Sequence, residues 1–374
     1  MKKIVHLTLA ASIALALTAC HNDKKDAPVI EPPPVPVVPA TLDISGAAVK
    51  GALIGAKVQI YRASDIALAT PLTTEPADVQ TDENGDYTAT VVDASGEAIV
   101  GALVVNITAD DDTVMRCDAA VMCADGTLRG ENIPNEEIAG ISVSTLTFAA
   151  VDADGESIAI DADANTFTTM ATDAVFSQLA INTNLDIDNL SFEGVVALQK
   201  NASLIVGEIL GIDLSSTNIY DIKIVDSTDT QAFADAAAAA GDNVDVTTQL
   251  TSFNAALAVL DTTGSTISAT INNYVQTVAV VSTTLVDALA EGTDIAIALA
   301  EPDAVAALAV LAPAQTAISD EATLIQDAVQ TDIDNNDDID IVIEKVIIPA
   351  IVPPIEIDLG DIIVPTGATG GTGG

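Results

Sequence analysis

The stretch Thr81-Asp82-Glu83-Asn84-Gly85-Asp86-Tyr87-Thr88-Ala89-Thr90-Val91, residues 81–91, carries the clearest fold signal in this sequence. Its Asn-Gly pair is the dipeptide that most strongly favours a tight turn between two antiparallel strands. After the turn, apolar side chains alternate with threonine, which predicts a strand with one buried and one exposed face. The stretch therefore predicts antiparallel β-structure in this part of the chain.

Similar short runs rich in valine, isoleucine and threonine lie on both sides of this stretch, separated by turns that contain glycine. Their composition and length are typical of strands. Strands are predicted at residues 42–49, 56–61, 85–92 and 99–108. We therefore expect a small N-terminal antiparallel β-sandwich at residues 42–112.

The order of glycines and turns in this region is similar to that of a known family. Ser45-Gly46, Val49-Lys50-Gly51 and Gly55-Ala56-Lys57-Val58, followed by the turn at residues 81–87, resemble the carboxypeptidase regulatory-like (transthyretin-like) β-sandwich over residues 42–110. The resemblance implies an accessory sandwich without catalytic residues that serves structure or partner binding. The segment from Met115 to Gly126 departs from the family pattern, and we expect it to form a hairpin within an extension at residues 113–150.

Beyond Ser144 the sequence changes from strand-like to helix-like patterning, and alanine and threonine become abundant. Shorter helices are predicted at residues 165–181, 192–210 and 230–240. Long stripes of apolar side chains at helical spacing follow at residues 246–260, 267–288 and 304–329. Gly264 and Gly292 are expected to end the first two stripes, and Pro313 to kink or start the third.

Short turns join these helices, so we expect an Ala/Thr-rich antiparallel helical bundle at residues 151–331. The stripes either bury only one another or leave one face for a partner helix. Together with the β-sandwich, the prediction is an α+β fold.

The N-terminal segment has the features of an export signal. Lys2 and Lys3 precede an apolar stretch, residues 4–17, that is too short for a stable membrane span. Leu17-Thr18-Ala19-Cys20 resembles the bacterial lipobox, which implies a signal peptide at residues 1–19 and a lipid on Cys20. The alternative is an ordinary signal peptide with a chance cysteine. His21 implies sorting to the outer membrane of a Gram-negative bacterium, and residues 20–41 are expected to form a proline-rich linker.

Acidic residues dominate the composition: 55 Asp and Glu stand against 12 Lys and Arg, for a formal net charge of -43. Such a surface repels phosphate backbones, which argues against nucleic-acid binding. The hydrophobic fraction of 49% and the mean hydropathy of +0.43 argue against a disordered chain. The only histidines are His6 and His21, which excludes a Ser-His-Asp triad or a histidine-ligated zinc site in the folded part, and we expect no enzymatic activity.

Two small sets of residues are candidate sites. Cys117 and Cys123 are expected to form a disulfide in an oxidising exported compartment, with two free thiols as the alternative. The acidic run at residues 332–340 offers oxygen ligands for Ca²⁺ from Asp332, Asp334, Asn336 and Asp338, and we expect no other cofactor. Asp337 stands where an EF-hand loop needs glycine, so the alternative is a solvated linker in an acidic, Pro/Gly-rich tail at residues 332–374.

These features leave two classes of function. The first is a noncatalytic, lipid-anchored envelope protein with a structural, adhesive or partner-binding role. The second is a ligand- or calcium-binding surface lipoprotein. Both classes contact a membrane through the N-terminal lipid, and both predict a protein partner or a cell-surface ligand for the folded part of the chain.

Overall fold

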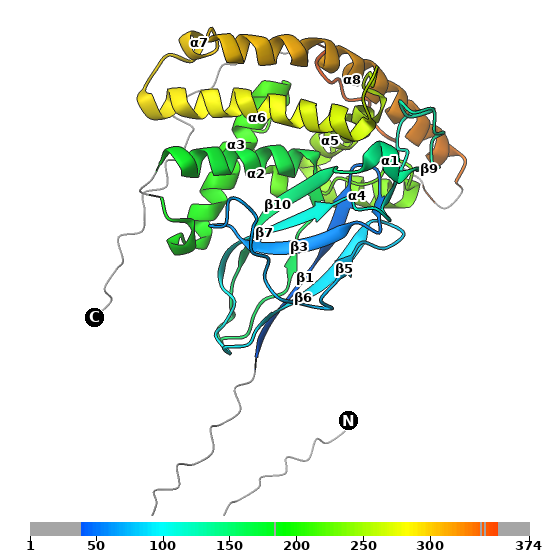
Figure 1. Ribbon diagram of the computed structural model, residues 1–374. Coiled ribbons are helices and arrows are strands. Elements are labelled where there is room, and N and C mark those ends of the chain that lie inside the picture. Colours follow the sequence, from blue (N-terminus) through cyan, green and yellow to red (C-terminus); the bar gives the residue numbers. More distant parts are fainter. Residues whose placement is uncertain (1–38, 183–184, 337–338, 340–341, 351–374) are drawn as a thin grey trace, which may run out of the picture. The chain divides into compact units, whose positions relative to one another are not determined.

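The strands in the described part of the chain form one large and one small sheet (Figure 1). The computed structural model describes residues 39–182, 185–336, 339 and 342–350, and all of them belong to one compact unit. In chain order the strands of these ranges are β1 (Ala40–Val49), β2 (Leu53–Ile54), β3 (Lys57–Arg62), β4 (Thr74–Glu75), β5 (Val79–Gln80), β6 (Asp86–Asp93), β7 (Gly101–Thr108), β8 (Val114–Arg116), β9 (Asn132–Ile133), β10 (Ser142–Ala149), β11 (Ile160–Asp161) and β12 (Ala164–Asn165).

The large sheet follows the order β4-β6-β1-β12-β10-β7-β3-β5, and β11 also pairs with β1. β1 and β6 are antiparallel, with Leu42 opposite Val91 and Gly46 opposite Tyr87. The alternation predicted after the Asn-Gly turn is confirmed, because Tyr87, Ala89 and Val91 are all buried. The sheet curls back on itself, since β5 at one end of the order contacts β6 near the other end.

The predicted small sandwich at residues 42–112 is wrong, because the sheet is larger and includes strands from beyond that range. β10 lies in the predicted extension at residues 113–150, yet it pairs along its whole length with β7. β7 has a continuous run of buried side chains from Ala102 to Val105, which is typical of a strand covered on both faces. β10 supplies hydrogen bonds to one edge of β7, and α2 (Thr166–Ile181) packs on β10.

The helices follow the large sheet in sequence, apart from the short α1, which lies between β9 and β10. The α-helices of the described ranges are α1 (Asn135–Ile138), α2 (Thr166–Ile181), α3 (Phe192–Leu210), α4 (Thr230–Ala240), α5 (Val244–Ala256), α6 (Ile267–Glu291), α7 (Ile295–Ala298) and α8 (Pro302–Asp334). Short 3₁₀ turns join several of them: η1 (Ile187–Asn189), η2 (Ile219–Asp221), η3 (Gly241–Asn243) and η4 (Leu257–Val259).

Local end signals fix several helix boundaries, and the predicted limits of α2, α3 and α4 are confirmed to within one residue. The Asn165 side chain accepts hydrogen bonds from the first backbone N–H groups of α2, while the Thr168 hydroxyl accepts one from the Asn165 N–H at 2.9 Å. This reciprocal capping box satisfies donors that a helix leaves unpaired. α6 ends, as predicted, at Gly292, which adopts the left-handed conformation with φ of 66°.

Two helices differ from their predicted stripes. α5 ends at Ala256, and the tight turn η4 replaces the rest of the stripe predicted to reach residue 260. α8 continues through Pro313, because buried side chains on both sides of the proline pack against α5 and α6. Among them is Gln315, whose amide donates to the Leu210 carbonyl at 3.0 Å and accepts from the Tyr274 hydroxyl at 3.1 Å.

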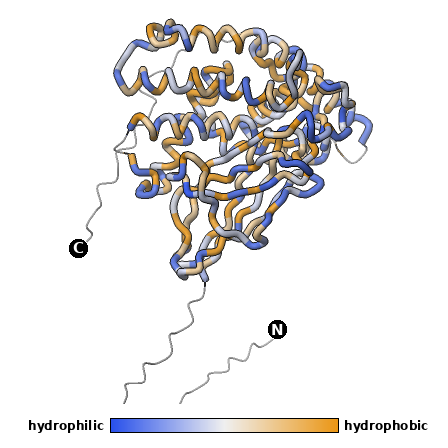
Figure 2. The backbone as a smooth tube through the Cα atoms, viewed as in Figure 1, coloured by the Kyte–Doolittle hydropathy of each residue, from blue (hydrophilic) through white to orange (hydrophobic). Residues whose placement is uncertain are grey.

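The sheet and the helices share one hydrophobic core, so the mixed α+β class is confirmed. α2 and α3 cover β10, α2 packs on α6, and α8 packs on both α5 and α6. Phe253 of α5 links these layers, because its ring meets Phe167 of α2 edge-on at 5.2 Å and Tyr274 of α6 at 6.3 Å. Figure 2 shows hydrophobic positions distributed along both the strands and the helices.

Residues 342–350 fall in the predicted tail, but they contact the helical region. The Gln326 side chain of α8 binds both backbone groups of Val346, accepting from its N–H at 2.9 Å and donating to its carbonyl at 3.1 Å. Gln249 of α5 donates to the Ile347 carbonyl at 2.9 Å, and the side chain of Ile348 is buried. Within the described ranges, no helix combines the length and the apolar character that a membrane crossing needs.

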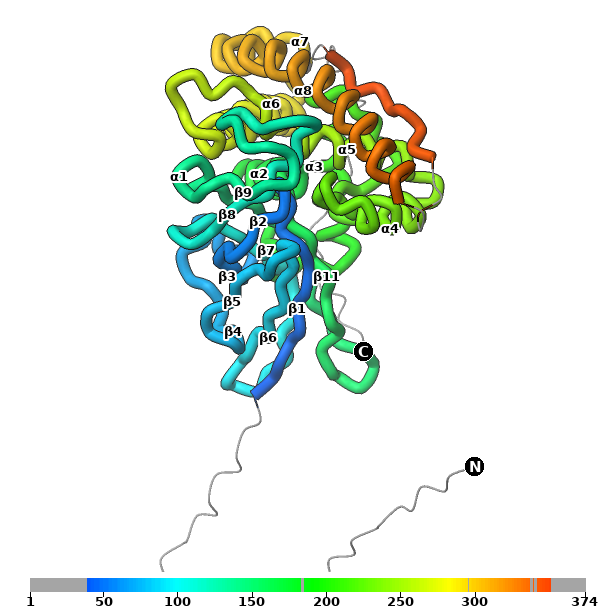
Figure 3. Tube along the Cα trace, turned by 90° about the vertical axis from the view of Figure 1, so that its right-hand side faces the viewer, coloured from blue at the N-terminus to red at the C-terminus, as the bar shows by residue number. Residues whose placement is uncertain are grey.

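The small sheet, of order β2-β8-β9, is antiparallel. Figure 3 shows it at the end of the large sheet that faces the helices. The chain leaves this sheet after β8 to form the loop that carries both predicted disulfide cysteines, and returns to it at β9. The small sheet therefore holds this loop where the strands meet the helical region.

Candidate functional site

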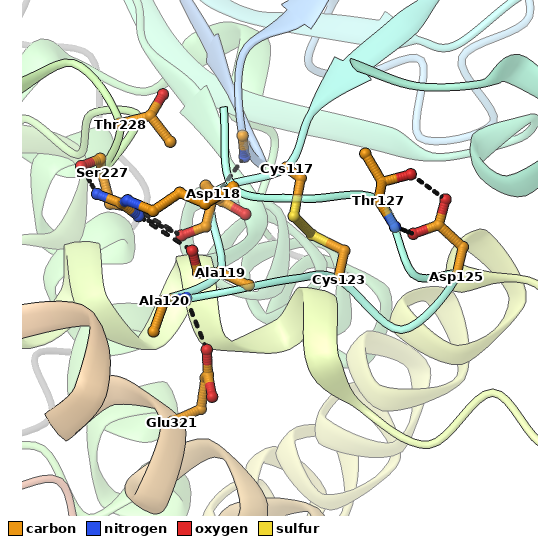
Figure 4. The surroundings of a disulfide bond; sticks show 12 residues. Cys117, Asp118, Ala119, Ala120, Cys123, Asp125, Thr127, Ser227, Thr228 and Glu321 are labelled. Carbon is orange, nitrogen blue, oxygen red and sulfur yellow. Dashed lines mark hydrogen bonds between the residues drawn. A yellow bond between two sulfur atoms is a disulfide. The ribbon is translucent and has the colours of Figure 1, made fainter. Parts of the chain in front are cut away.

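Cys117 and Cys123 form a disulfide bond that closes a short loop after β8 (Figure 4). Both cysteines are buried, and their sulfur atoms lie 2.11 Å apart. The loop is also tied to the helical region: the Ala120 N–H donates to Glu321 Oε1 of α8 at 2.7 Å, and the Ala124 N–H donates to the Ala258 carbonyl at 2.9 Å. The cysteine pair therefore closes a loop that joins the small sheet to the helices.

Asp118, inside this loop, pairs with Lys50, which follows β1 directly. Nζ of Lys50 lies 3.3 Å from Oδ1 of Asp118, and the two side chains are 0% and 1% exposed. The other carboxylate oxygen, Oδ2, accepts a hydrogen bond from the Gly51 N–H at 2.8 Å. Burial raises the pKa of Asp118 to about 6; the charge of Lys50 opposes this shift and that of Asp226 adds to it. Fully buried lysines and aspartates are rare, because each ion loses its hydration.

Gly51 reaches this carboxylate through a conformation that favours glycine. Its φ is +60°, and a Cβ atom at this position would lie 2.1 Å from the carbonyl oxygen of Arg116. Any larger residue would force the end of β1 away from β8. The Val49-Lys50-Gly51 turn, noted above for its resemblance to a sandwich family, thus also builds the contact with Asp118.

Two further ion pairs surround the first. Arg116 Nη1 lies 3.2 Å from Asp226 Oδ2, which also accepts from the Ala52 N–H at 3.2 Å. Arg129 Nη1 donates to the Asp118 carbonyl at 3.2 Å, and its Nη2 lies 3.4 Å from Asp332 Oδ2 at the end of α8. We call these six residues, Lys50, Arg116, Asp118, Arg129, Asp226 and Asp332, the charged junction.

Ser227 completes the hydrogen bonding at the charged junction. Its hydroxyl donates to the Asp118 carbonyl at 2.7 Å and accepts from Arg129 at 3.0 Å, and its own carbonyl accepts from Arg129 at 2.6 Å. Three positive and three negative groups therefore join β1, the disulfide loop, the segment before α4 and the end of α8.

Sequence reasoning missed the charged junction. Lys50 and Asp118 are 68 residues apart, and Arg129 and Asp332 are 203 residues apart, so no local pattern relates them. One usable signal is the scarcity of basic residues. The chain has only 12 Lys and Arg, and three of them lie in the charged junction. Each basic residue of so acidic a chain is therefore a candidate partner for a buried carboxylate.

A second candidate is an open cleft of about 380 Å³ between the large sheet and the helices α2 and α6. Asp173 of α2 lines it, and burial raises the pKa of this carboxyl to about 6. The Ser177 hydroxyl donates to the backbone carbonyl of Asp173, but among the described residues no donor reaches its carboxylate. Other lining residues, which we group with it as the Asp173 cleft, are Asn106, Ser144, Thr169, Phe176 and Asn272.

The predicted calcium ligands are not gathered into one site in the part of the chain that the structure describes. Asp332 and Asp334 lie in the last turn of α8, where Asp332 pairs with Arg129 and Asp334 accepts from Gln330 at 2.8 Å. Residues two apart in an α-helix are rotated by about 200° relative to each other, so their side chains point to different sides. Asn336 follows the helix, and Asp338 lies outside the described residues. Within the described residues, no group of three or more His, Cys, Asp or Glu side chains could hold a metal ion, and calcium binding stays a prediction.

The predicted lipidation site, Cys20, also lies outside the described residues. Comparison with known proteins finds no matching family model, no matching curated protein and no matching solved structure. The resemblances to the lipobox and to the carboxypeptidase regulatory-like family therefore stay predictions from the residues that carry them.

Proposed function

We propose that this chain is a noncatalytic, lipid-anchored envelope protein, in which Cys20 carries the lipid and the folded unit has a structural, adhesive or partner-binding role. The observation that carries the proposal is the Leu17-Thr18-Ala19-Cys20 sequence after a short apolar stretch. Two or more acyl chains on one cysteine bury enough methylene groups for durable attachment. The expected location is the outer membrane of a Gram-negative bacterium.

Three further features support this proposal. The proline-rich residues 20–41 suit a spacer between a membrane and β1, where the folded unit begins. A disulfide is typical of proteins that leave the reducing cytosol. Histidine, the commonest acid-base catalyst, is scarce in this chain, and the charged groups of the charged junction pair with one another. Both observations favour a structural or binding role over acid-base catalysis.

The test is to replace the proposed lipid acceptor. Cys20→Ser expressed in a Gram-negative host should move from the membrane pellet to the soluble fraction in detergent-free fractionation, because the lipid is the proposed membrane contact. The matched control is Cys123→Ala, which also removes a cysteine but should stay in the pellet. A Cys20→Ser protein that remains membrane-bound would contradict the proposal.

The Asp173 cleft supports a second candidate function, binding of a small polar ligand. A carboxyl group that is largely buried, lines an open cleft and lacks a donor suits a ligand that brings a cation or several hydroxyl groups. Isothermal titration calorimetry with putrescine and with glucose tests the two ligand classes. Binding of either should be lost in Asp173→Asn and kept in Asp235→Asn, an exposed control on α4. No binding of either probe to the wild type would contradict this candidate.

A further inference from the structure

Ion pairing alone does not explain the contact between Lys50 and Asp118. An ammonium group has three N–H donors, but within the described residues the Lys50 Nζ makes a single hydrogen bond, to Asp118 Oδ1. Lys50 is 0% exposed, so solvent does not reach its remaining donors. Buried polar groups without partners are unfavourable and rare in native proteins. A chemical state of this pair with fewer donors would fit the site better.

We propose that Lys50 and Asp118 react in the folded protein to form an intramolecular amide bond between Nζ and Cγ. The ammonium and the carboxylate together lose one molecule of water. The Nζ–Cγ bond forms, the Cγ–Oδ1 bond breaks, and Oδ1 leaves with two protons that come from the ammonium group. The product is a neutral secondary amide with one N–H, and the reaction needs no oxidant, metal or cofactor.

The two carboxylate oxygens of Asp118 have the surroundings that this reaction requires. Oδ1, the leaving oxygen, faces Nζ at 3.3 Å. Oδ2, which becomes the amide carbonyl oxygen, already accepts from the Gly51 N–H at 2.8 Å. A backbone N–H fixed in this position stabilises the negative charge that develops on Oδ2 when the amine attacks Cγ. The glycine-specific conformation of Gly51 holds that donor in place.

The environment of the pair also favours amide formation. The attacking amine must be neutral and the carboxyl protonated, and burial together with the charge of Asp226 favours the protonated form of Asp118. Holding the two groups in contact replaces an encounter in solution with an intramolecular step. Exclusion of water from the site disfavours the reverse reaction, hydrolysis.

The amide would complement the nearby disulfide. The disulfide closes the loop on itself over a sequence separation of 6, whereas the amide would join the loop to the end of β1 across 68 residues. The strands, the loop and, through Ser227 and Arg129, the segment before α4 and the end of α8 would then be held by covalent and ionic links at one place. This inference does not depend on the lipid anchor.

Tryptic peptide mapping of the full chain tests the proposal. The protein is purified in its folded state, then denatured and reduced before digestion, so that every unmodified lysine is accessible. An amide on Lys50 blocks cleavage there, so residues 26–57 should appear joined to residues 117–129, with a mass one water molecule below the sum of the two peptides. Cleavage after Lys57 is the internal control for complete digestion.

Two variants assign the bond to these side chains. Lys50→Arg and Asp118→Ala should both lack the joined peptide, and circular dichroism of each variant reports whether the fold is kept. The decisive measurement is on the wild type and needs no variant to fold. Recovery of residues 26–50, 51–57 and 117–129 as separate peptides from the folded wild-type protein would overturn the proposal. Persistence of the joined peptide in Asp118→Ala would overturn the assignment to Asp118.

Discussion

Asp118 in the charged junction and Asp173 in the cleft both have a pKa raised to about 6, with burial as the first cause, yet their surroundings are opposite. Asp118 is enclosed, with Lys50 on one oxygen and the Gly51 N–H on the other. Asp173 lines an open cleft, and no donor in the described part of the chain reaches its carboxylate. Burial therefore raises the pKa of both carboxyl groups, but Asp118 is already bound to other parts of the chain, whereas the carboxyl of Asp173 is available to a ligand.

The largest expected effect comes from removing the enclosed carboxyl. Asp118→Ala removes the partner of Lys50 in both states of the pair, ionic or joined by the amide, and leaves the Lys50 ammonium buried alone. Removing one partner of a buried pair lowers the free energy of unfolding by about 3–5 kcal/mol, and loss of the amide would add to this. Urea unfolding followed by circular dichroism measures the change. The matched control, Asp235→Ala on the exposed face of α4, should change stability by less than about 0.5 kcal/mol. Equal stability of the two variants would mean that the enclosed site is not a structural link.

A smaller effect, of opposite sign, is expected at the cleft. The pKa of the Asp173 carboxyl is 3.8 in the unfolded chain and about 6 in the folded protein. Between these two pH values the folded state binds more protons than the unfolded state, so the stability of the protein falls as pH rises. Asp173→Asn removes this penalty, and with allowance for partial exposure it should raise the free energy of unfolding by about 2 kcal/mol at pH 7.

Urea unfolding at two pH values checks this prediction. The advantage of Asp173→Asn over the wild type should disappear below the unfolded-state pKa, where both forms are neutral. Asp235→Asn, on the exposed face of α4, is the control for a change of charge alone. An advantage that is the same at both pH values would show that Asp173 ionisation is not its source.

The same contrast explains how much the sequence could predict. Strands β1, β3, β6 and β7 and helices α2, α3 and α4 were predicted because their signals are local: alternation, helical spacing and a capping residue such as Asn165. The disulfide between Cys117 and Cys123 could also be predicted from the sequence, because the two residues are six positions apart and no other cysteine lies in the described ranges.

What the sequence could not predict depends on contacts between distant segments. The place of β10 beside β7 requires pairing between Ser142 and Thr108, and no local pattern chooses that partner. The charged junction is a stronger case, since Lys50 alone in a turn is ordinarily a solvated residue. Only the fold, with Gly51 against the Arg116 carbonyl, brings Lys50 to Asp118.

The smallest effect is expected at the exposed edge of the charged junction. Asp332 is 44% exposed in its pair with Arg129, so Asp332→Ala should lower the free energy of unfolding by only about 0.5–1 kcal/mol. Asp334→Ala is the matched control, because Asp334 lies in the same helical turn but contacts Gln330 and not Arg129. Urea unfolding with and without millimolar calcium measures both variants.

Calcium separates the two interpretations of this acidic segment. If Asp332 acts through Arg129, its variant is less stable than Asp334→Ala by the same amount with and without the ion. If the segment holds calcium, the ion raises the stability of the wild type by mass action, and this gain is lost in both variants alike, because each removes a ligand. The second outcome would assign the segment to cation binding and leave Arg129 with Asp118 and Ser227 as its main partners.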